Sequence, residues 1–105
     1  MPIAELTAQE AKRRLDQGEI ALVDVREVWE LELAHIDGAL HIPLGELPER
    51  LHELPADRAL VFVCHHGVRS LHACLVARAG GLVGANLRGG IAAWSAEVDP
   101  KVPQY

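Results

Sequence analysis

The sequence predicts an α/β domain built on a mainly parallel sheet. Short apolar runs alternate with segments of helical periodicity along all 105 residues, an alternation that is typical of parallel sheets. Two runs, residues 20–25 and 59–64, are almost continuously apolar, as strands buried on both faces are. No repeat, low-complexity tract or linker divides the chain, and its length predicts a single domain over residues 1–105.

The chain is predicted to open with a helix over residues 7–19. Thr7 and Glu10 have the spacing of a capping box, and Gly18 stands where a glycine is preferred at a helix end. A strand over residues 20–25 follows. The next predicted elements are a short helix over 27–34, a short strand over 39–43 that Pro43 ends, and a short helix over 45–54.

The second half of the chain carries the clearest strand signal, residues 59–64, which end on a cysteine. A helix is predicted over residues 70–81, where paired glycines end it. A last short strand is predicted over 83–87 and a last helix over 89–97. The inner face of the 70–81 helix is expected to carry the apolar residues that recur at helical spacing, namely Leu71, Cys74, Leu75 and Ala79.

Composition and charge narrow the classes of function. The net charge of −5 argues against a general binder of nucleic acid or of membrane surfaces, which needs a basic face. Apolar runs are short and interrupted by charge, and the first residues show no signal pattern, so we expect a cytoplasmic protein. Cys64 and Cys74 are too few for a disulfide framework and are expected to be thiols.

A chemically unusual segment, CHHGVRS, joins the second apolar strand to the next helix. Ligands bind at the carboxyl ends of strands in open α/β sheets, where Cys64 and Asp24 both fall. Unpaired N–H groups at the helix start, together with the helix dipole, favour a bound anion and a thiolate. Gly67 permits a tight turn, and Ser70 begins the helix and offers a hydroxyl. Arg69 adds a permanent cation that can bind an oxyanion through two hydrogen bonds.

The spacing within this segment bears on its chemistry. Four residues separate Cys64 from Arg69, which makes a tight loop. A phosphate attacked by the cysteine needs a wider cradle, so that all its oxygens are bound while sulfur attacks. A tight loop suits the terminal sulfur of a persulfide on Cys64, surrounded by N–H donors. The spacing therefore favours sulfur chemistry over phosphoryl chemistry.

Three segments resemble the rhodanese family of sulfurtransferases: the CHHGVRS loop, residues 24–43 (DVREVWELELAHIDGALHIP) and residues 87–94 (LRGGIAAW). They stand in the order that the family has them, and they cover nearly the whole chain. The resemblance implies a five-stranded, mainly parallel sheet with helices on both faces. It also implies that Cys64 is the sulfur-accepting nucleophile, and we expect no cofactor and no metal.

By the same resemblance, the loop residues supply amides around the persulfide, namely His65, His66, Gly67, Val68 and Arg69. Arg69 and the two histidines would bind a small anionic donor such as thiosulfate. The implied reaction is ping-pong: the thiolate takes the outer sulfur and releases sulfite, and the persulfide then passes sulfur to cyanide, a small thiol or a protein thiol. The histidines are expected to form the pocket rim and to gain positive charge as the pH falls towards their pKa.

Further residues are expected to support the site. Asp24 is interpreted as a structural anchor and not a general base, because a thiolate that is already formed needs no base. Arg26 and Glu30 are expected to form an ion pair that braces the walls of the site. His35 is expected to tie the loop after the preceding helix to its neighbours. Ala34 stands where the family has glycine, which requires a backbone without positive φ at that position.

Several alternatives stay open. Cys74 is a packing residue or a resolving thiol, with packing favoured. Cys64, His65, His66 and His72 do not follow a recognised metal-ligand spacing. By the family resemblance, one alternative function is that of a phosphatase or arsenate reductase on the same fold, whose active-site loop is one residue longer. Another is a non-catalytic binding module, although such modules on this fold tend to lack the cysteine. A small domain with few covering loops would admit a protein thiol as acceptor, and a monomer is the default state.

Overall fold

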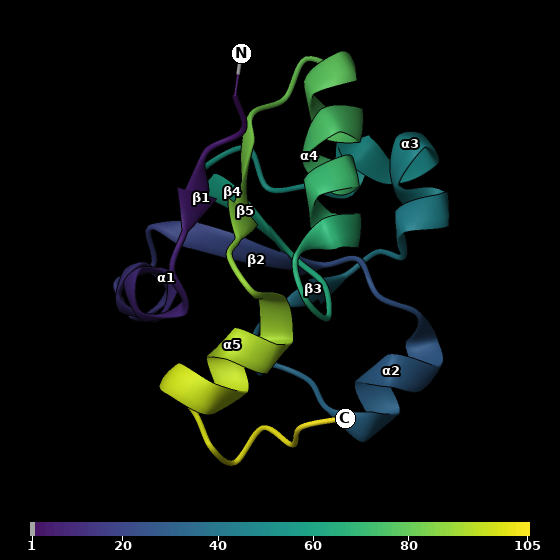
Figure 1. The fold of residues 1–105 in the computed structure, drawn as a ribbon. Helices are drawn as coiled ribbons and strands as arrows, with labels where there is room; N and C mark the ends of the chain where they lie inside the picture. Colours follow the sequence, from purple (N-terminus) through teal and green to yellow (C-terminus); the bar gives the residue numbers. More distant parts are fainter. Residues whose placement is uncertain (1) are drawn as a thin grey trace.

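Five parallel strands form the centre of the protein in a computed structural model, which describes residues 2–105 (Figure 1). The strands lie in the order β1-β5-β4-β2-β3, and every adjacent pair among them is parallel. The predicted fold class is confirmed, and β1 is an edge strand that the sequence patterns did not predict. The strands span Glu5–Leu6 (β1), Ile20–Asp24 (β2), Leu40–His41 (β3), Ala59–Val63 (β4) and Gly84–Leu87 (β5).

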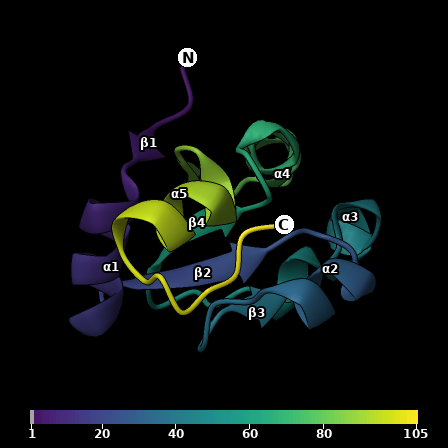
Figure 2. The ribbon, with the colours of Figure 1, turned by 60° about the horizontal axis from the view of Figure 1, so that its bottom comes forward.

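Helices cover both faces of the sheet (Figures 1 and 2). Short 3₁₀ turns over Leu44–Glu46 and Leu51–Glu53 flank α3 on its two sides. Within residues 2–105, no helix combines the length and the apolar content that crossing a bilayer requires. The helices span Ala8–Asp16 (α1), Val28–Leu33 (α2), Leu47–Arg50 (α3), Val68–Ala79 (α4) and Gly90–Glu97 (α5).

Helix α1 begins and ends where its capping signals predict. The Thr7 hydroxyl oxygen accepts a hydrogen bond from the Glu10 amide at 3.1 Å, and the Glu10 carboxylate accepts one in return from the Thr7 amide at 3.4 Å. Gly18 adopts a φ of 73°, in the left-handed region that favours glycine. Local sequence chemistry therefore determines both ends of this helix.

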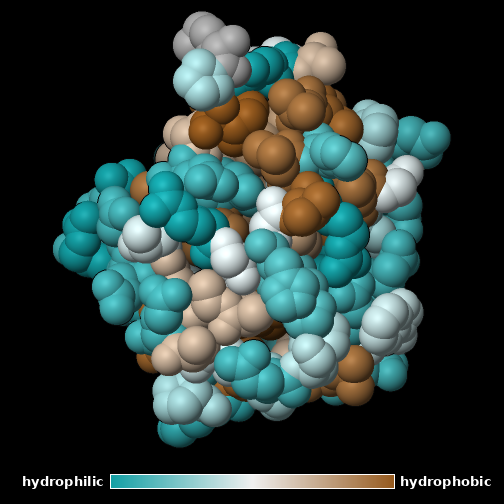
Figure 3. Space-filling model, in the orientation of Figure 1, coloured by the Kyte–Doolittle hydropathy of each residue, from teal (hydrophilic) through white to brown (hydrophobic). Residues whose placement is uncertain are grey.

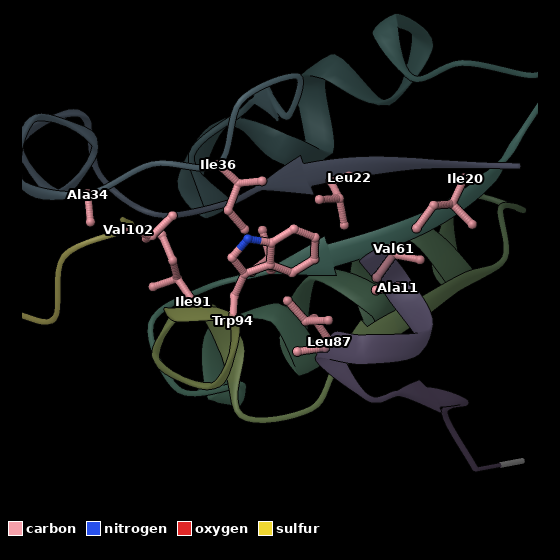
Figure 4. Close-up of a cluster of buried hydrophobic side chains, with 12 residues drawn as sticks. Ala11, Ile20, Leu22, Ala34, Ile36, Val61, Leu87, Ile91, Trp94 and Val102 are labelled. Atoms are coloured by element: carbon pink, nitrogen blue, oxygen red, sulfur yellow. The ribbon is translucent and has the colours of Figure 1, made fainter. Parts of the chain in front are cut away.

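Alternation along the buried strands divides the core into two clusters. Ile20 and Leu22 of β2 point towards α1 and α5, where Trp94 is the largest side chain (Figure 4). Ala21 and Val23 point to the other face and pack with Phe62 against α3 and α4. All five residues of β2 are buried, as the nearly continuous apolar run predicts.

The predicted inner face of α4 is partly wrong. Cys74 is buried as predicted, but Leu71 and Leu75 are 38% and 47% exposed, and Ala79 is exposed as well. In Figure 3, hydrophobic residues gather on the surface where α4 lies in Figure 1. Small side chains let this helix lie close to the sheet, so the face towards the sheet is formed by Ser70, Ala73, Cys74 and Ala77.

Candidate active site

Cys64 lies one residue beyond the end of β4 and is only 1% exposed. In the neighbouring strand, Asp24 pairs with Val63, so Cys64 and Asp24 meet at the carboxyl edge of the sheet as predicted. Helix α4 begins at Val68, two residues before the predicted start at Ser70. Gly67 precedes it with a φ of 106°, a conformation that glycine adopts without strain. The turn from strand to helix is therefore as tight as the spacing indicates.

The sulfur of Cys64 is surrounded by hydrogen-bonding groups. The Gly67 amide donates to Sγ at 3.1 Å, and the Ser70 hydroxyl oxygen lies 3.3 Å from Sγ. Burial raises the pKa of the thiol, but the Ser70 hydroxyl and the amides of Ser70, Gly67 and His66 together lower it further than burial raises it. The net pKa of Cys64 is below its ordinary value, so the site favours a thiolate.

Two segments outside the loop hold it in place. The Asn86 amide in β5 donates to the Gly67 carbonyl at 3.0 Å, while its Oδ1 accepts from the Ser70 hydroxyl at 2.5 Å. Two amides in the first turn of α5, those of Ile91 and Ala92, donate to the carbonyls of Cys64 and His65 at 2.8 and 3.1 Å. Neither support is among the predictions made from the sequence. The paired glycines in the LRGG segment are the one signal from which the second support could have been found.

Gly90 shows why glycine is needed at this contact. It has a φ of 62°, and a Cβ added there would overlap the carbonyl oxygens of Cys64 and His65. The loop backbone thus packs directly against the start of α5, without an intervening side chain. We call the contacts that Asn86 and the start of α5 make with the loop the loop clamp.

Arg69 forms a bidentate ion pair with Glu30 of α2. Its two terminal nitrogens donate to the Glu30 oxygens at 2.5 and 2.8 Å. The Arg69 pair is the largest cause that lowers the pKa of the Glu30 carboxyl to about 2. Arg69 keeps 37% of its side chain exposed, so a donor anion would meet a guanidinium already fixed by a carboxylate. The two-bond contact with an oxyanion that the sequence suggested would have to use the remaining N–H groups of Arg69.

The predicted ion pair between Arg26 and Glu30 is wrong. The Arg26 guanidinium pairs with Asp24, with Nη2 2.7 Å from Oδ2 and Nε 3.0 Å from Oδ1, and both residues are buried. Arg26 reaches Glu30 only at its backbone carbonyl, at 3.4 Å. The Asp24 carboxylate also accepts a hydrogen bond from the Arg26 backbone amide, at 3.0 Å, just beyond the end of β2. This pair suits the structural role expected of Asp24.

His35 does not lie where it was expected. Its side chain is 60% exposed, and its hydrogen-bonding partner within the described residues is the Asp37 carboxylate, at 3.1 Å. The residue before it makes the link to the site, because the Ala34 carbonyl accepts from Arg26 Nη2 at 2.8 Å. Ala34 has a φ of −162°, an extended conformation that any residue adopts, so replacing the family glycine causes no strain here.

The loop histidines lie at the rim of the site. The His65 ring stacks between the rings of His66 and Tyr105, with both centroid distances at 3.9 Å. Burial, followed by the charge of His66, lowers the pKa of His65, so its ring carries less positive charge at neutral pH than the sequence suggested. Val68 is exposed at the first turn of α4. Tyr105 had no local signal beyond an aromatic residue at the end of a proline-containing segment.

Metal binding finds no support among the described residues. Within residues 2–105, no group of three or more histidine, cysteine, aspartate or glutamate side chains is placed to hold a metal ion. Cys64 and Cys74 are both free thiols and both buried. The groups around Cys64, which are N–H donors and a neighbouring arginine, favour the thiolate form of its side chain.

Comparison with known proteins agrees with the fold and with the motifs. The rhodanese-like domain family matches residues 7–97. The chain is 35% identical over 102 residues to YtwF of Bacillus subtilis. The alignment covers 96% of this chain and 99% of that protein. It is 38% identical over 96 residues to a sulfurtransferase of Allochromatium vinosum, covering 89% of each. The structure of the human single-domain sulfurtransferase TSTD1 aligns with a TM-score of 0.80 at 32% identity, covering 91% of this chain and 98% of that one. By its sequence and its fold, this chain belongs to the rhodanese family.

Proposed function

We propose that this chain is a sulfurtransferase that carries a sulfane sulfur as a persulfide on Cys64. The observation that carries the proposal is the surroundings of Sγ: a buried sulfur with a lowered pKa that the Gly67 amide and the Ser70 hydroxyl contact. Such a site stabilises negative charge on sulfur both before and after a second sulfur is added. The sulfurtransferases among the relatives support transfer of sulfur in general.

The donor in this proposal is a small anion such as thiosulfate. The Cys64 thiolate attacks the outer sulfur, a new S–S bond forms, and the S–S bond of thiosulfate breaks, so that sulfite leaves with the electron pair. Loop amides from His65 to Arg69 surround the terminal sulfur of the persulfide. Arg69 draws the anion to the entrance of the loop, while Glu30 keeps the guanidinium oriented.

The acceptor completes the cycle by attacking the terminal sulfur. Cyanide carbon bonds to that sulfur and leaves as thiocyanate, while the Cys64 thiolate is regenerated with the electron pair of the broken S–S bond. A thiolate acceptor reacts in the same way and leaves as a persulfide, and a thiol on a small molecule or on a protein serves equally. Two free thiols fit a reducing compartment, so we place this activity in the cytoplasm.

Intact mass spectrometry tests the proposal directly. The wild-type protein, Cys64→Ser and Cys74→Ser are each incubated with thiosulfate, weighed, and weighed again after cyanide. Wild type and Cys74→Ser are expected to gain the mass of one sulfur atom and lose it with cyanide, whereas Cys64→Ser gains nothing. A wild-type protein that takes up no sulfur while Cys64 remains free to alkylation would contradict the proposal. Hydrolysis of an aryl phosphate by that protein would then favour a phosphatase.

A further inference from the structure

The segment after α5 follows a fixed path to the active site. Val102 is buried in the same cluster as Ala34, Ile91 and Trp94 (Figure 4). The Ser95 hydroxyl of α5 donates to the Val102 carbonyl at 2.5 Å, which ties this segment back to the helix. Figures 1 and 2 show the chain running from α5 across the molecule until it ends near α2. The packing of Val102 thus determines where the residues after it lie.

The Tyr105 hydroxyl bridges the two ion pairs of the site. It donates to Glu30 Oε2 at 2.6 Å and accepts from Arg26 Nη1 at 2.8 Å. Arginine can only donate, so the single hydroxyl hydrogen of Tyr105 must go to Glu30. The hydroxyl therefore links the buried pair of Asp24 and Arg26 to the pair of Glu30 and Arg69 at the entrance of the loop.

The ring of Tyr105 makes a separate contact with the loop. It stacks on His65 at a centroid distance of 3.9 Å and an interplanar angle of 6°. His65 directly follows Cys64, and its own carbonyl is held by the start of α5. One residue thus touches both the carboxylate that orients Arg69 and the first side chain after the nucleophile.

We infer that Tyr105 is a positioning residue of the Cys64 site, whose hydroxyl fixes the Glu30 carboxylate that orients Arg69. The consequence for donor binding rests on the proposed function. Without the hydroxyl, the Glu30 carboxylate keeps, among residues 2–105, only the Glu27 amide and Arg69 as hydrogen-bonding partners. The Arg69 guanidinium is then held less firmly when an anion arrives. The hydrogen bonds from Ser70, Gly67 and His66 that lower the pKa of Cys64 are not touched by this change, and Arg69 keeps its charge, so we expect little change in that pKa.

Tyr105→Phe removes the hydroxyl and keeps the ring, and Gln104→Ala at the exposed neighbouring position is the matched control. We expect Tyr105→Phe to raise KM for thiosulfate about five-fold, with kcat and the pH profile of Cys64 alkylation unchanged. Gln104→Ala is expected to match wild type in all three quantities. Tyr105→Leu also removes the stacked ring and is expected to lower kcat in addition, because His65 loses its neighbour.

A second measurement does not depend on sulfur transfer. The rates of Cys64 alkylation by iodoacetate, an anion, and by iodoacetamide, which is neutral, are measured for each variant. The ratio of the two rates reports how strongly the site attracts an anion, and it is expected to fall about three-fold in Tyr105→Phe. If wild type takes up no sulfur from thiosulfate and the ratio still falls, the proposed function fails and the positioning role stands.

Two results would overturn the inference. The first is a Tyr105→Phe protein with the wild-type KM and the wild-type alkylation ratio, because the hydroxyl would then have no effect on how Arg69 attracts an anion. The second is a variant in which both reagents slow equally and the pKa of Cys64 shifts, because Tyr105 would then support the fold in general and not the placement of Arg69.

Discussion

The Ser70 hydroxyl donates its only hydrogen to Oδ1 of Asn86 at 2.5 Å, while its oxygen lies 3.3 Å from Sγ of Cys64. The orientation of the Asn86 amide follows from its other partners, because its NH₂ group donates to the Gly67 carbonyl and to the Glu5 carboxylate. With a thiol, the S–H of Cys64 can donate to the Ser70 oxygen. When the thiolate forms, sulfur and Asn86 compete for the same hydroxyl hydrogen.

The Ser70 hydroxyl contributes to the acidity of Cys64 despite this competition. Ser70→Ala removes the hydroxyl that helps to lower the pKa of the thiol, while burial, which raises it, remains. We expect the pKa of Cys64 to rise above its wild-type value, because burial is then opposed by fewer hydrogen bonds to sulfur. The rate of iodoacetamide alkylation as a function of pH measures this shift, and a profile identical to wild type would contradict it.

Gly90 is expected to tolerate no side chain. In Gly90→Ala, the added Cβ would meet the carbonyl oxygens of Cys64 and His65 at a residue with positive φ. We expect a loss of unfolding free energy of about 2 kcal/mol or more, with slower sulfur uptake in whatever remains folded. Urea denaturation measures the loss. Gly45→Ala is the control, because a Cβ there meets nothing within 4 Å and φ is not positive, so equal stabilities of the two variants would count against the prediction.

The Glu30 carboxylate should make stability depend on pH in the acidic range. Its pKa in the folded protein is lowered to about 2, chiefly by Arg69, so its contribution is fully present above the unfolded pKa of roughly 4.3 and is lost as the pH falls towards 2. Glu30→Gln is expected to cost about 2 kcal/mol at neutral pH, a figure that allows for the partial exposure of Arg69.

Denaturation of wild type and Glu30→Gln at a series of pH values measures this difference. The gap in unfolding free energy between the two proteins should close as the pH is lowered from roughly 5 to roughly 2. A gap that stays constant over this range would mean that the charge of Glu30 contributes nothing to folding.

The two cysteines should differ sharply in reactivity. Burial raises the pKa of Cys74 to about 11, whereas the pKa of Cys64 is lowered. At neutral pH we expect iodoacetamide to modify Cys64 at least about 100-fold faster than Cys74, because the thiolate is the reacting species. Peptide mapping after a short exposure checks this ratio, and Cys64→Ser should remain almost unlabelled. Rapid labelling of Cys74 would revive its alternative role as a resolving thiol.

The features that local sequence patterns predicted are those that local chemistry determines. The nearly continuous apolar runs of β2 and β4 predict strands that are buried on both faces, whichever elements cover them. The capping box of Thr7 and Glu10 needs no distant partner. The two residues of β1 are too few to show any periodicity. In α4, small residues lie at spacings as regular as those of its leucines, so the pattern could not say which set faces the sheet.

The hydrogen bonds and ion pairs of the site join residues that are far apart in the sequence, so local sequence patterns do not predict them. The partner of Glu30 is Arg69, 39 positions away, while the nearer Arg26 pairs with Asp24. Tyr105 lies 75 positions from the carboxylate that it contacts. Several acidic and basic residues were equally eligible in the sequence, and only the geometry of the folded chain selects among them.

The loop clamp also has a consequence for how this site could evolve. The carbonyls of Cys64, His65 and Gly67 each accept a hydrogen bond from a group outside the loop. A residue inserted into the loop would therefore break at least one of these hydrogen bonds. Widening the loop for a larger oxyanion would require simultaneous changes in β5 and at the start of α5. A one-residue insertion made alone should therefore yield a damaged sulfur site and not a new phosphate site, which makes loop length a barrier between the two chemistries in this lineage.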